Sequence, residues 1–276
     1  MDELIRRVAD AILYEGYILY PYRPSSAKNR QRWTFGVLYP PAYAAAQRGA
    51  DRAAFHCECL VAGGGEVSGV LRFLQIATRD GWQEGVARDV PLRAAAFAFD
   101  ADRCVEGRIR FDFSDAAPGV RKLAVEVENT TPFRGGDDRE AALPYSLVSA
   151  HLILHVEGGS FVSLLDPPAA LASAAAACRN EGVFPVLAGE RGSHDAMLVS
   201  PIILYDWPEL APESPGDLFD ATEIDEILSL RILTLTEDEQ REAAAADARA
   251  RRVIERTAAL TPEELRNLHG AIRRGQ

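Results

Sequence analysis

Two cysteines and two histidines are the residues of this chain whose types and spacing could do chemistry. Cys57 and Cys59 lie in "FHCECLV", and His151 and His155 lie in "HLILH". On a β-strand, residues two or four positions apart share a face, so each pair could present two ligands together. Two thiolates and two imidazoles form a donor set that suits tetrahedral zinc. The alternative interpretation is that both cysteines are small buried apolar residues.

Other catalytic patterns are weaker. The chain has no CxxC, HExxH or GxSxG sequence, and its "AGGGE" stretch is too short to cradle phosphates. Glu126 and Glu128 share a strand face and could form a carboxylate pair for sugar chemistry, although a solvated sheet face also explains them. The sequence therefore favours a protein that is not an enzyme and predicts no cofactor. A metal carrier or enzyme using the two cysteines and two histidines stays open as the alternative.

The segment "YPYRPSSAKNRQRWTFGVLYP" is basic and aromatic in an otherwise acidic chain, whose formal net charge is −11. Arginine, tyrosine and tryptophan are enriched at interface hot spots because they bury a large area with few rotors. The sequence therefore predicts a partner-binding surface. Its residues are Tyr22, Arg23, Lys28, Arg30, Arg32 and Trp33.

Acidic residues gather in a different part of the chain. Residues 206–230 contain eight acidic residues and no basic one, whereas residues 16–50 contain five basic residues and no acidic one. Two interpretations stay open. Either the acidic segment packs against the basic one, or each segment binds a partner of opposite charge.

Length and composition limit the function classes. The 276 residues are 47% hydrophobic and 26% charged, which is typical of a globular protein with a substantial core. The net negative charge disfavours nucleic acid as a partner. No stretch resembles a signal peptide or a membrane span, and four cysteines without framework spacing fit reduced thiols. We therefore expect a cytoplasmic protein with neither a nucleic-acid nor a membrane partner.

Hydrophobic patterning predicts an α+β fold with a mainly antiparallel β body. Period-two alternation in "RIRFDF" and "LAVEVEN" indicates strands with one buried face. Helical spacing predicts a helix over residues 2–12, and "PPAALASAAAACRN" predicts another. The segments "YEGYILYPY" and "RWTFGVLY" read as strands, and "HLILHVEGGSFVSLLDPP" as a hairpin over Gly158-Gly159. A sandwich or a partly closed barrel is the expected architecture.

The character of the chain changes after Trp207. We predict a mainly antiparallel β domain over residues 1–207, then a proline-rich acidic connector and C-terminal helices over residues 208–276. Capping-box pairs predict helix starts at Asp220/Glu223, Thr236/Glu239 and Thr261/Glu264. The helix opened by Thr236 is expected to continue without a break through "EDEQREAAAADARARRVIERT".

Three blocks of sequence carry a resemblance to a known family. They are "YEGYILYPYRPSSAKNRQRWTFGVLYP", "GGSFVSLLDPP" and "SPIILYDWPELAPESPGDLFDATEIDEILSLRILTLTEDE". In these blocks the chain resembles an uncharacterised family of accessory proteins encoded in bacterial [NiFe]-hydrogenase gene clusters. The resemblance implies a cytoplasmic factor in hydrogenase maturation whose client is a hydrogenase subunit.

We therefore expect a non-enzymatic accessory or assembly factor that binds a client protein. Besides the metal-binding alternative, a carbohydrate-binding β-sandwich is a second alternative. It rests on fold analogy and on solvated aromatic side chains such as Trp82 and Tyr145.

Overall fold

The computed structural model describes residues 3–23, 26, 28, 29, 32–49, 51–79, 82–210, 225–261 and 264. The chain divides into two compact units. Unit 1 consists of Met1–Leu13 and Trp33–Glu209, and unit 2 consists of Tyr14–Arg32 and Leu210–Gln276.

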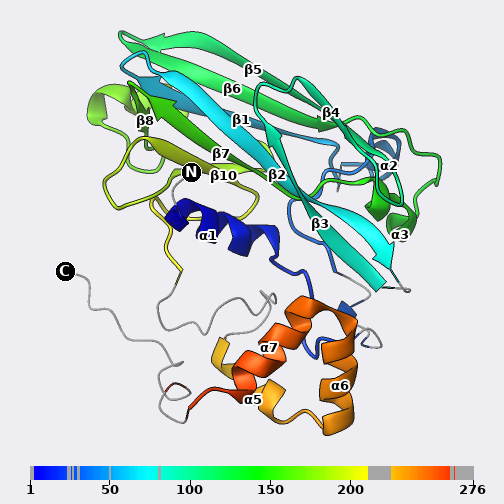
Figure 1. Cartoon of the computed structure of the whole chain (residues 1–276). Coiled ribbons are helices and arrows are strands. Elements are labelled where there is room, and N and C mark those ends of the chain that lie inside the picture. The colour runs from blue at the N-terminus through cyan, green and yellow to red at the C-terminus, as the bar shows by residue number, and fades with distance from the viewer. Residues whose placement is uncertain are drawn as a thin grey trace. The chain divides into compact units, whose positions relative to one another are not determined.

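Unit 1 is a β-sandwich-like body of two antiparallel five-stranded sheets (Figure 1). The first sheet has the order β4-β5-β6-β1-β8 and the second has the order β3-β2-β7-β10-β9. The first comprises β1 (Ala54–Ala62), β4 (Ala96–Phe99), β5 (Val105–Ala117), β6 (Val120–Asn129) and β8 (Ser160–Val162). The second comprises β2 (Glu66–Arg79), β3 (Trp82–Pro91), β7 (Val148–Glu157), β9 (Phe184–Leu187) and β10 (Ala196–Ser200). The sheets do not close into a barrel, and the predicted α+β class with a mainly antiparallel body is confirmed.

Alternating side chains build the first sheet as the sequence predicted. In β6, Leu123, Val125 and Val127 are fully buried in the core between the sheets. The intervening Glu126 and Glu128 lie on the outer face and form ion pairs with arginines of β5. One apolar face and one charged face are what an antiparallel sheet with one solvated side requires.

In the second sheet, the strands β7 and β10 are buried on both faces. All five residues of β10 are buried, which matches the near-continuous apolar sequence of that strand. Its outer face is covered by α1 (Glu3–Leu13), whose Ile5, Val8 and Ile12 pack against Ile153 and Leu198 (Figure 1). The predicted N-terminal helix is therefore confirmed, and its apolar stripe explains why β7 and β10 carry apolar side chains on this outer face.

The strands of unit 1 differ from the predicted ones in several places. The turn at Gly158-Gly159 does not close a hairpin, because β8 pairs with β1 of the first sheet and β7 belongs to the second. The chain crosses between sheets there, which lets Phe161 enter the core. The sequence analysis missed β3, whose exposed residues hide the period-two pattern. The segment 32–39 contains no strand among its described residues, and only Leu38 forms isolated bridges, to Arg52 and Leu147.

Short helical segments connect the strands of unit 1. The predicted helix at "PPAALASAAAACRN" is reduced to the 3-10 turn η3 (Ala169–Leu171) and the short helix α4 (Ala172–Ala176). It lies over Leu60 and Val162 at the edge of the first sheet. The remaining segments are α2 (Pro41–Ala46), α3 (Arg139–Ala142) and η2 (Leu143–Tyr145).

Unit 2 contains the C-terminal helices α5 (Asp225–Leu233), α6 (Glu237–Ala246) and α7 (Ala248–Ala258). The capping box of Thr236 and Glu239 is confirmed at the start of α6. The expected uninterrupted helix is wrong, because Asp247 adopts an extended backbone and caps α7 by accepting a hydrogen bond from the Arg249 amide at 2.6 Å. Thr261 and Glu264 also make their capping contacts. The pair Asp220/Glu223 lies outside the described residues.

The segment Tyr14–Arg32 belongs to unit 2, whereas the sequence placed it in the β domain. Its side chains explain the difference, since they bind the C-terminal helices. The Tyr17 hydroxyl donates to Asp247 at 2.7 Å, and the Arg249 guanidinium stacks 3.9 Å from the Tyr14 ring. Arg23 forms an ion pair with Glu239 at 3.2 Å. The strand predicted over residues 14–22 is absent from this described stretch, which forms turns, bends and irregular backbone.

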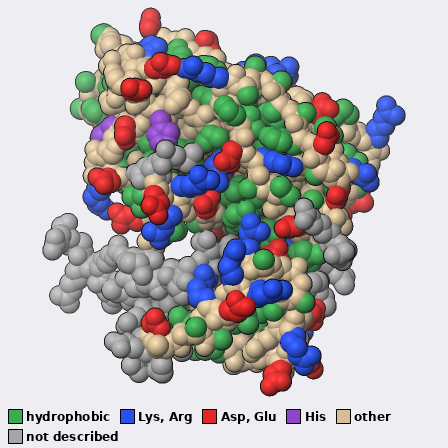
Figure 2. Space-filling view, in the orientation of Figure 1, with side chains coloured by type: hydrophobic (Ala, Val, Ile, Leu, Met, Phe, Trp, Pro, Cys, Tyr) green, Lys and Arg blue, Asp and Glu red, His purple; other side chains and the backbone are tan. Residues whose placement is uncertain are grey.

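None of the helices in the described ranges is both long and apolar enough to cross a membrane. Figure 2 shows basic and acidic side chains interspersed on the visible face of unit 1.

Candidate functional site

The two cysteines and the two histidines do not meet in the structure. Cys57 and Cys59 point from β1 into the core between the sheets and are fully buried. His151 and His155 alternate on β7 with Leu152 and Leu154, which occupy that core, so both imidazoles lie on the outer face of the second sheet. Among the described residues no group of three or more potential ligands gathers around one point. The predicted metal site is therefore not assembled.

The cysteines instead behave as core residues. A hydrogen bond with the Cys59 thiol, and then burial, hold the pKa of Cys57 well above its usual value. A raised pKa keeps the thiol protonated, which is the opposite of what a metal ligand or a nucleophile needs.

His151 is buried beneath α1 as a neutral residue. Its Nδ1 lies 2.7 Å from the Ser149 carbonyl oxygen, so the neutral ring donates through this nitrogen. Burial, and to a smaller degree the charge of Arg72, lower the pKa of His151 to about 4. Arg72 is itself buried, and it forms ion pairs with Asp10 at 2.7 Å and Asp89 at 3.0 Å.

The basic segment predicted to bind a partner is largely occupied by contacts within the chain. Tyr22 is fully buried, and the Arg32 guanidinium donates to the Tyr17 carbonyl oxygen at 3.1 Å. In unit 1, the Trp33 indole is 2% exposed and donates to Gln83 at 3.0 Å. These side chains have a structural role, so the predicted docking surface needs correction at these positions.

The remaining basic residues divide into three cases. Arg23 is paired with Glu239 and Glu242 of unit 2. Lys28 is exposed in a short 3-10 turn. Arg30 lies outside the described residues. The interpretation in which basic and acidic segments of the chain pair with each other holds for Arg23. Its acidic partners, however, lie in α6 and not in the connector.

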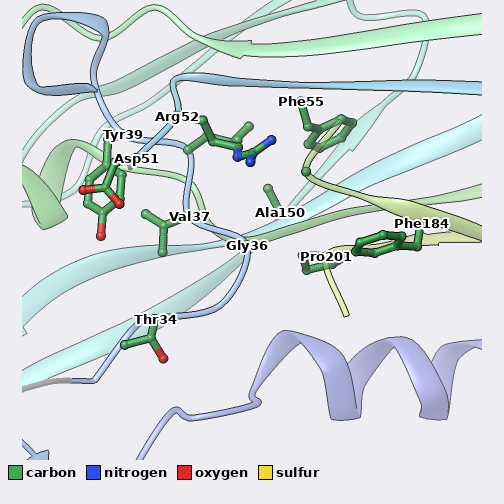
Figure 3. Close-up of a pocket in the computed structure, with 12 residues that line it drawn as sticks. Thr34, Gly36, Val37, Tyr39, Asp51, Arg52, Phe55, Ala150, Phe184 and Pro201 are labelled. Atoms are coloured by element: carbon green, nitrogen blue, oxygen red, sulfur yellow. The ribbon is translucent and has the colours of Figure 1, made fainter. Parts of the chain in front are cut away.

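A pocket lies in unit 1, where β1, β7 and β9 begin and β10 ends (Figure 3). We call it the end pocket, and its volume is about 330 Å³. Phe55, Phe184 and Pro201 form an apolar wall (Figure 3). Arg52, from the loop before β1, lies opposite this wall, with Ala150 between them (Figure 3). Val37 also lines the pocket. The other residues that line it are Thr34, Gly36, Leu38, Tyr39, Asp51 and Gly182.

The backbone around the end pocket is unusual. Gly36 has a φ of +53°, and a Cβ at this position would lie 2.5 Å from a Pro201 side-chain carbon. Ser149 also has a positive φ, 53°, although it is a buried non-glycine residue. It lies at a register irregularity between β2 and β7, next to Ala150. Bulges and strained residues cluster beside binding sites, where they re-aim the chain.

Tyr39 lines the end pocket, and its ring packs against the ring of Tyr43 in α2 at a centroid distance of 4.7 Å. Burial raises the pKa of Tyr39, and the Arg139 guanidinium, which donates to the Tyr39 hydroxyl at 3.1 Å, opposes this increase. Burial and then the negative charge of Asp51 raise the pKa of Tyr43 to about 12. Both hydroxyls therefore stay protonated at neutral pH and act as hydrogen-bonding groups.

The segment Pro201–Glu209, which we call the strap, follows β10 and continues from the wall of the pocket. Ile202 and Leu204 pack against the cluster under α1. Ile203 and Tyr205 are exposed, by 74% and 57%. The strap thus alternates between inward and outward apolar side chains.

Hydrogen bonds anchor the end of the strap. The Asp206 carboxylate accepts from the Leu187 amide at 2.7 Å and from the Ser163 hydroxyl at 2.5 Å. The backbone amide of Trp207 donates to the Leu187 carbonyl oxygen. The indole of Trp207 donates to the Ser193 carbonyl oxygen at 2.7 Å. These bonds hold the strap beside the edge strand β9, with Ile203 and Tyr205 left outside.

The outer face of the first sheet carries a second hollow, of about 490 Å³, lined by His56, Phe111 and the pair Arg110–Glu126. Glu126 and Glu128 are both ion-paired with arginines. The aromatics named for carbohydrate binding are partly buried, and Tyr145 packs against Phe133. The carboxylate pair is thus engaged in a charge ladder across β5 and β6.

The sequence analysis missed Arg52, Phe184 and the exposed side of the strap. The strap begins at Pro201, directly after the last residue of β10, in the near-continuous apolar sequence "AMLVSPIILYDW". A proline cannot donate to the ladder of a central strand, and this signal was present in the sequence. No local pattern marks Arg52, because its partners in the pocket are distant in sequence.

Comparison with known proteins adds no identification: no protein-family model and no curated protein sequence matches the chain.

Proposed function

We propose that this protein is a non-enzymatic accessory factor that binds a client protein, and that the strap is the docking surface. One observation carries the proposal: Ile203 and Tyr205 are exposed side by side on a backbone that Asp206 and Trp207 anchor. The proposed docking surface is therefore the strap and not the basic segment that the sequence analysis predicted.

Physical chemistry supports this choice of surface. An isoleucine that is 74% exposed leaves apolar area in water, which burial against a client would remove. Tyrosine is enriched among the residues that dominate binding energy. Because the strap is already anchored, binding would cost little conformational entropy for its backbone. Single exposed apolar residues are common and need no explanation. Two such residues on one anchored segment beside an edge strand support its use as a binding surface.

The resemblance to accessory proteins of [NiFe]-hydrogenase gene clusters suggests the client. We propose a hydrogenase subunit, bound in the cytoplasm during maturation. The strap lies in the third of the sequence blocks that carry this resemblance.

Measuring the affinity of the chain for purified [NiFe]-hydrogenase subunits, one at a time, tests the proposal. We expect one subunit to bind, and we expect Ile203→Asp and Tyr205→Ala to weaken this binding about tenfold or more, the usual effect of removing a hot spot. The matched control is Phe111→Asp, since Phe111 is also an exposed apolar residue, 41% exposed, but lies on β5 of the first sheet.

Two results would overturn the proposal at different levels. If folded strap variants bind the subunit as well as the unchanged chain does, the strap is not the docking surface. If no subunit binds at micromolar concentration, the accessory role in hydrogenase maturation is wrong.

A further inference from the structure

We propose that the end pocket binds a small organic monocarboxylate with an apolar body, and that Arg52 is its anion-binding residue. This inference goes beyond client binding and does not depend on it. It rests on the cavity, on the position of Arg52 and on the apolar wall opposite.

The pocket has the size of a small-molecule site, and its lining joins an apolar wall to a polar part. Its volume of about 330 Å³ lies at the lower end of the range for ligand pockets, about 300–1,000 Å³. Such sites combine apolar walls with a few polar groups that orient the ligand. Here Phe55, Phe184 and Pro201 form the wall, and the Arg52 guanidinium points toward it across Ala150 (Figure 3).

Arg52 is the cation that faces this space. Among the described residues no carboxylate lies within 4 Å of its guanidinium, although two acidic residues are near. Glu181 is held by Arg179 at 2.6 Å, and Arg179 is also the main cause of the lowered pKa of Glu181, with Arg52 the weakest contributor. Asp51 points away from the wall, on the side of Tyr39 (Figure 3), and interacts with the Tyr43 hydroxyl.

Gly182 leaves room for Arg52 in this position. A Cβ on Gly182 would lie 2.4 Å from one terminal nitrogen of Arg52 and 2.9 Å from its Cδ. The guanidinium therefore packs directly against the Gly182 backbone, whose φ of +81° favours glycine. Packing on this side restricts the arginine, which reduces the side-chain entropy that it loses on binding an anion.

The charges select a ligand with one negative charge. A guanidinium binds a carboxylate through two parallel hydrogen bonds, which gives both strength and direction. Asp51 and Glu181 lie close enough to repel a second negative charge, so phosphates and dicarboxylates fit poorly. The apolar wall, with Phe184 41% exposed, suits a branched aliphatic chain or a single ring.

Titration calorimetry of the full chain with phenylacetate and with 4-methylpentanoate tests the inference. Phenylacetamide, which has the same body but no charge, is the matched ligand control and needs no variant. We expect both acids to bind with submillimolar to millimolar affinity, and we expect phenylacetamide to bind about tenfold more weakly or worse. Inorganic phosphate should not bind measurably.

Three variants assign the binding to the pocket. Arg52→Gln should weaken phenylacetate binding about tenfold or more, and Phe184→Ala should weaken it less. Arg191→Gln is the control, because Arg191 is an exposed arginine in the turn before β10, outside the pocket. Equal binding of phenylacetate and phenylacetamide, or no binding of either acid at 10 mM (about 2.7 kcal/mol of binding free energy), overturns the inference. Unchanged binding by folded Arg52→Gln overturns the role of Arg52.

Discussion

At the scale of single residues, Cys57 and His151 are fully buried, and their shifted pKa values keep both side chains neutral at neutral pH. The neutral state of His151 has a consequence for stability. Its pKa is about 4 in the folded chain, against an ordinary value of 6.5. Above pH 6.5 the imidazole is neutral in both the folded and the unfolded state. As the pH falls from 6.5 to 4, the unfolded chain binds a proton that the folded chain does not, so the free energy of unfolding decreases.

We therefore predict that His151 makes unit 1 less stable by up to about 3 kcal/mol as the pH falls from 6.5 to 4, since each unit of pKa corresponds to about 1.4 kcal/mol. His151→Asn, which keeps a donor near the Ser149 carbonyl but does not titrate, should flatten this part of the profile. Urea unfolding at several pH values measures the effect. The control is His194→Asn at an exposed histidine, and identical pH profiles for His151→Asn and the unchanged chain would contradict the prediction.

At the scale of elements, Asp247 shows how one side chain can decide where a helix ends. It caps α7 through the Arg249 amide, and it also accepts a hydrogen bond from the Tyr17 hydroxyl. Removing a cap of this kind costs about 1 kcal/mol, and leaving the buried Tyr17 hydroxyl without its acceptor costs about 1–3 kcal/mol more.

We predict that Asp247→Ala speeds amide hydrogen exchange in α6 and α7 by more than tenfold, because the two losses add. Thr236→Ala, which removes only the exposed cap of α6, should change exchange less. Combining Asp247→Ala with Tyr17→Phe should recover part of the loss, since the hydroxyl that needs an acceptor is then gone. Equal effects of Asp247→Ala and Thr236→Ala would show that the contact with Tyr17 contributes nothing.

The sequence predicted the elements whose period is clear, and it missed those that depend on distant partners. The alternation in "LAVEVEN" and the helical spacing of residues 2–12 identified β6 and α1 correctly. The aromatic segment after Leu13 looked like a strand because tyrosines favour strands, but stacking with arginines of α5 and α7 decides its conformation. The end pocket could not be predicted, because Arg52, Ala150 and Phe184 meet only through the topology of the two sheets.

At the scale of the whole molecule, the chain passes between its two units three times, after Leu13, after Arg32 and after Glu209. Unit 2 therefore brings together segments that are about two hundred residues apart in sequence. Arg23 joins them by its ion pairs with Glu239 at 3.2 Å and Glu242 at 3.7 Å. The side chains are about 30% exposed, so each pair is worth less than about 1 kcal/mol. The aromatic and hydrogen-bonded contacts of Tyr14 and Tyr17 add to them.

This arrangement makes a charge-reversal test informative at Arg23 and uninformative at Arg32. Reversing Arg32 would bury an unpaired acid, so any loss of client binding could come from damage to unit 2. Arg23→Glu instead places three acidic side chains together near the surface. We predict that it speeds amide exchange in Tyr14–Tyr22 and in α6 by about three- to tenfold, and that adding Glu239→Arg restores most of the protection, because one ion pair re-forms with reversed polarity. If Arg23→Glu leaves exchange unchanged but abolishes binding of a hydrogenase subunit, the basic segment serves a partner and not the chain's own helices.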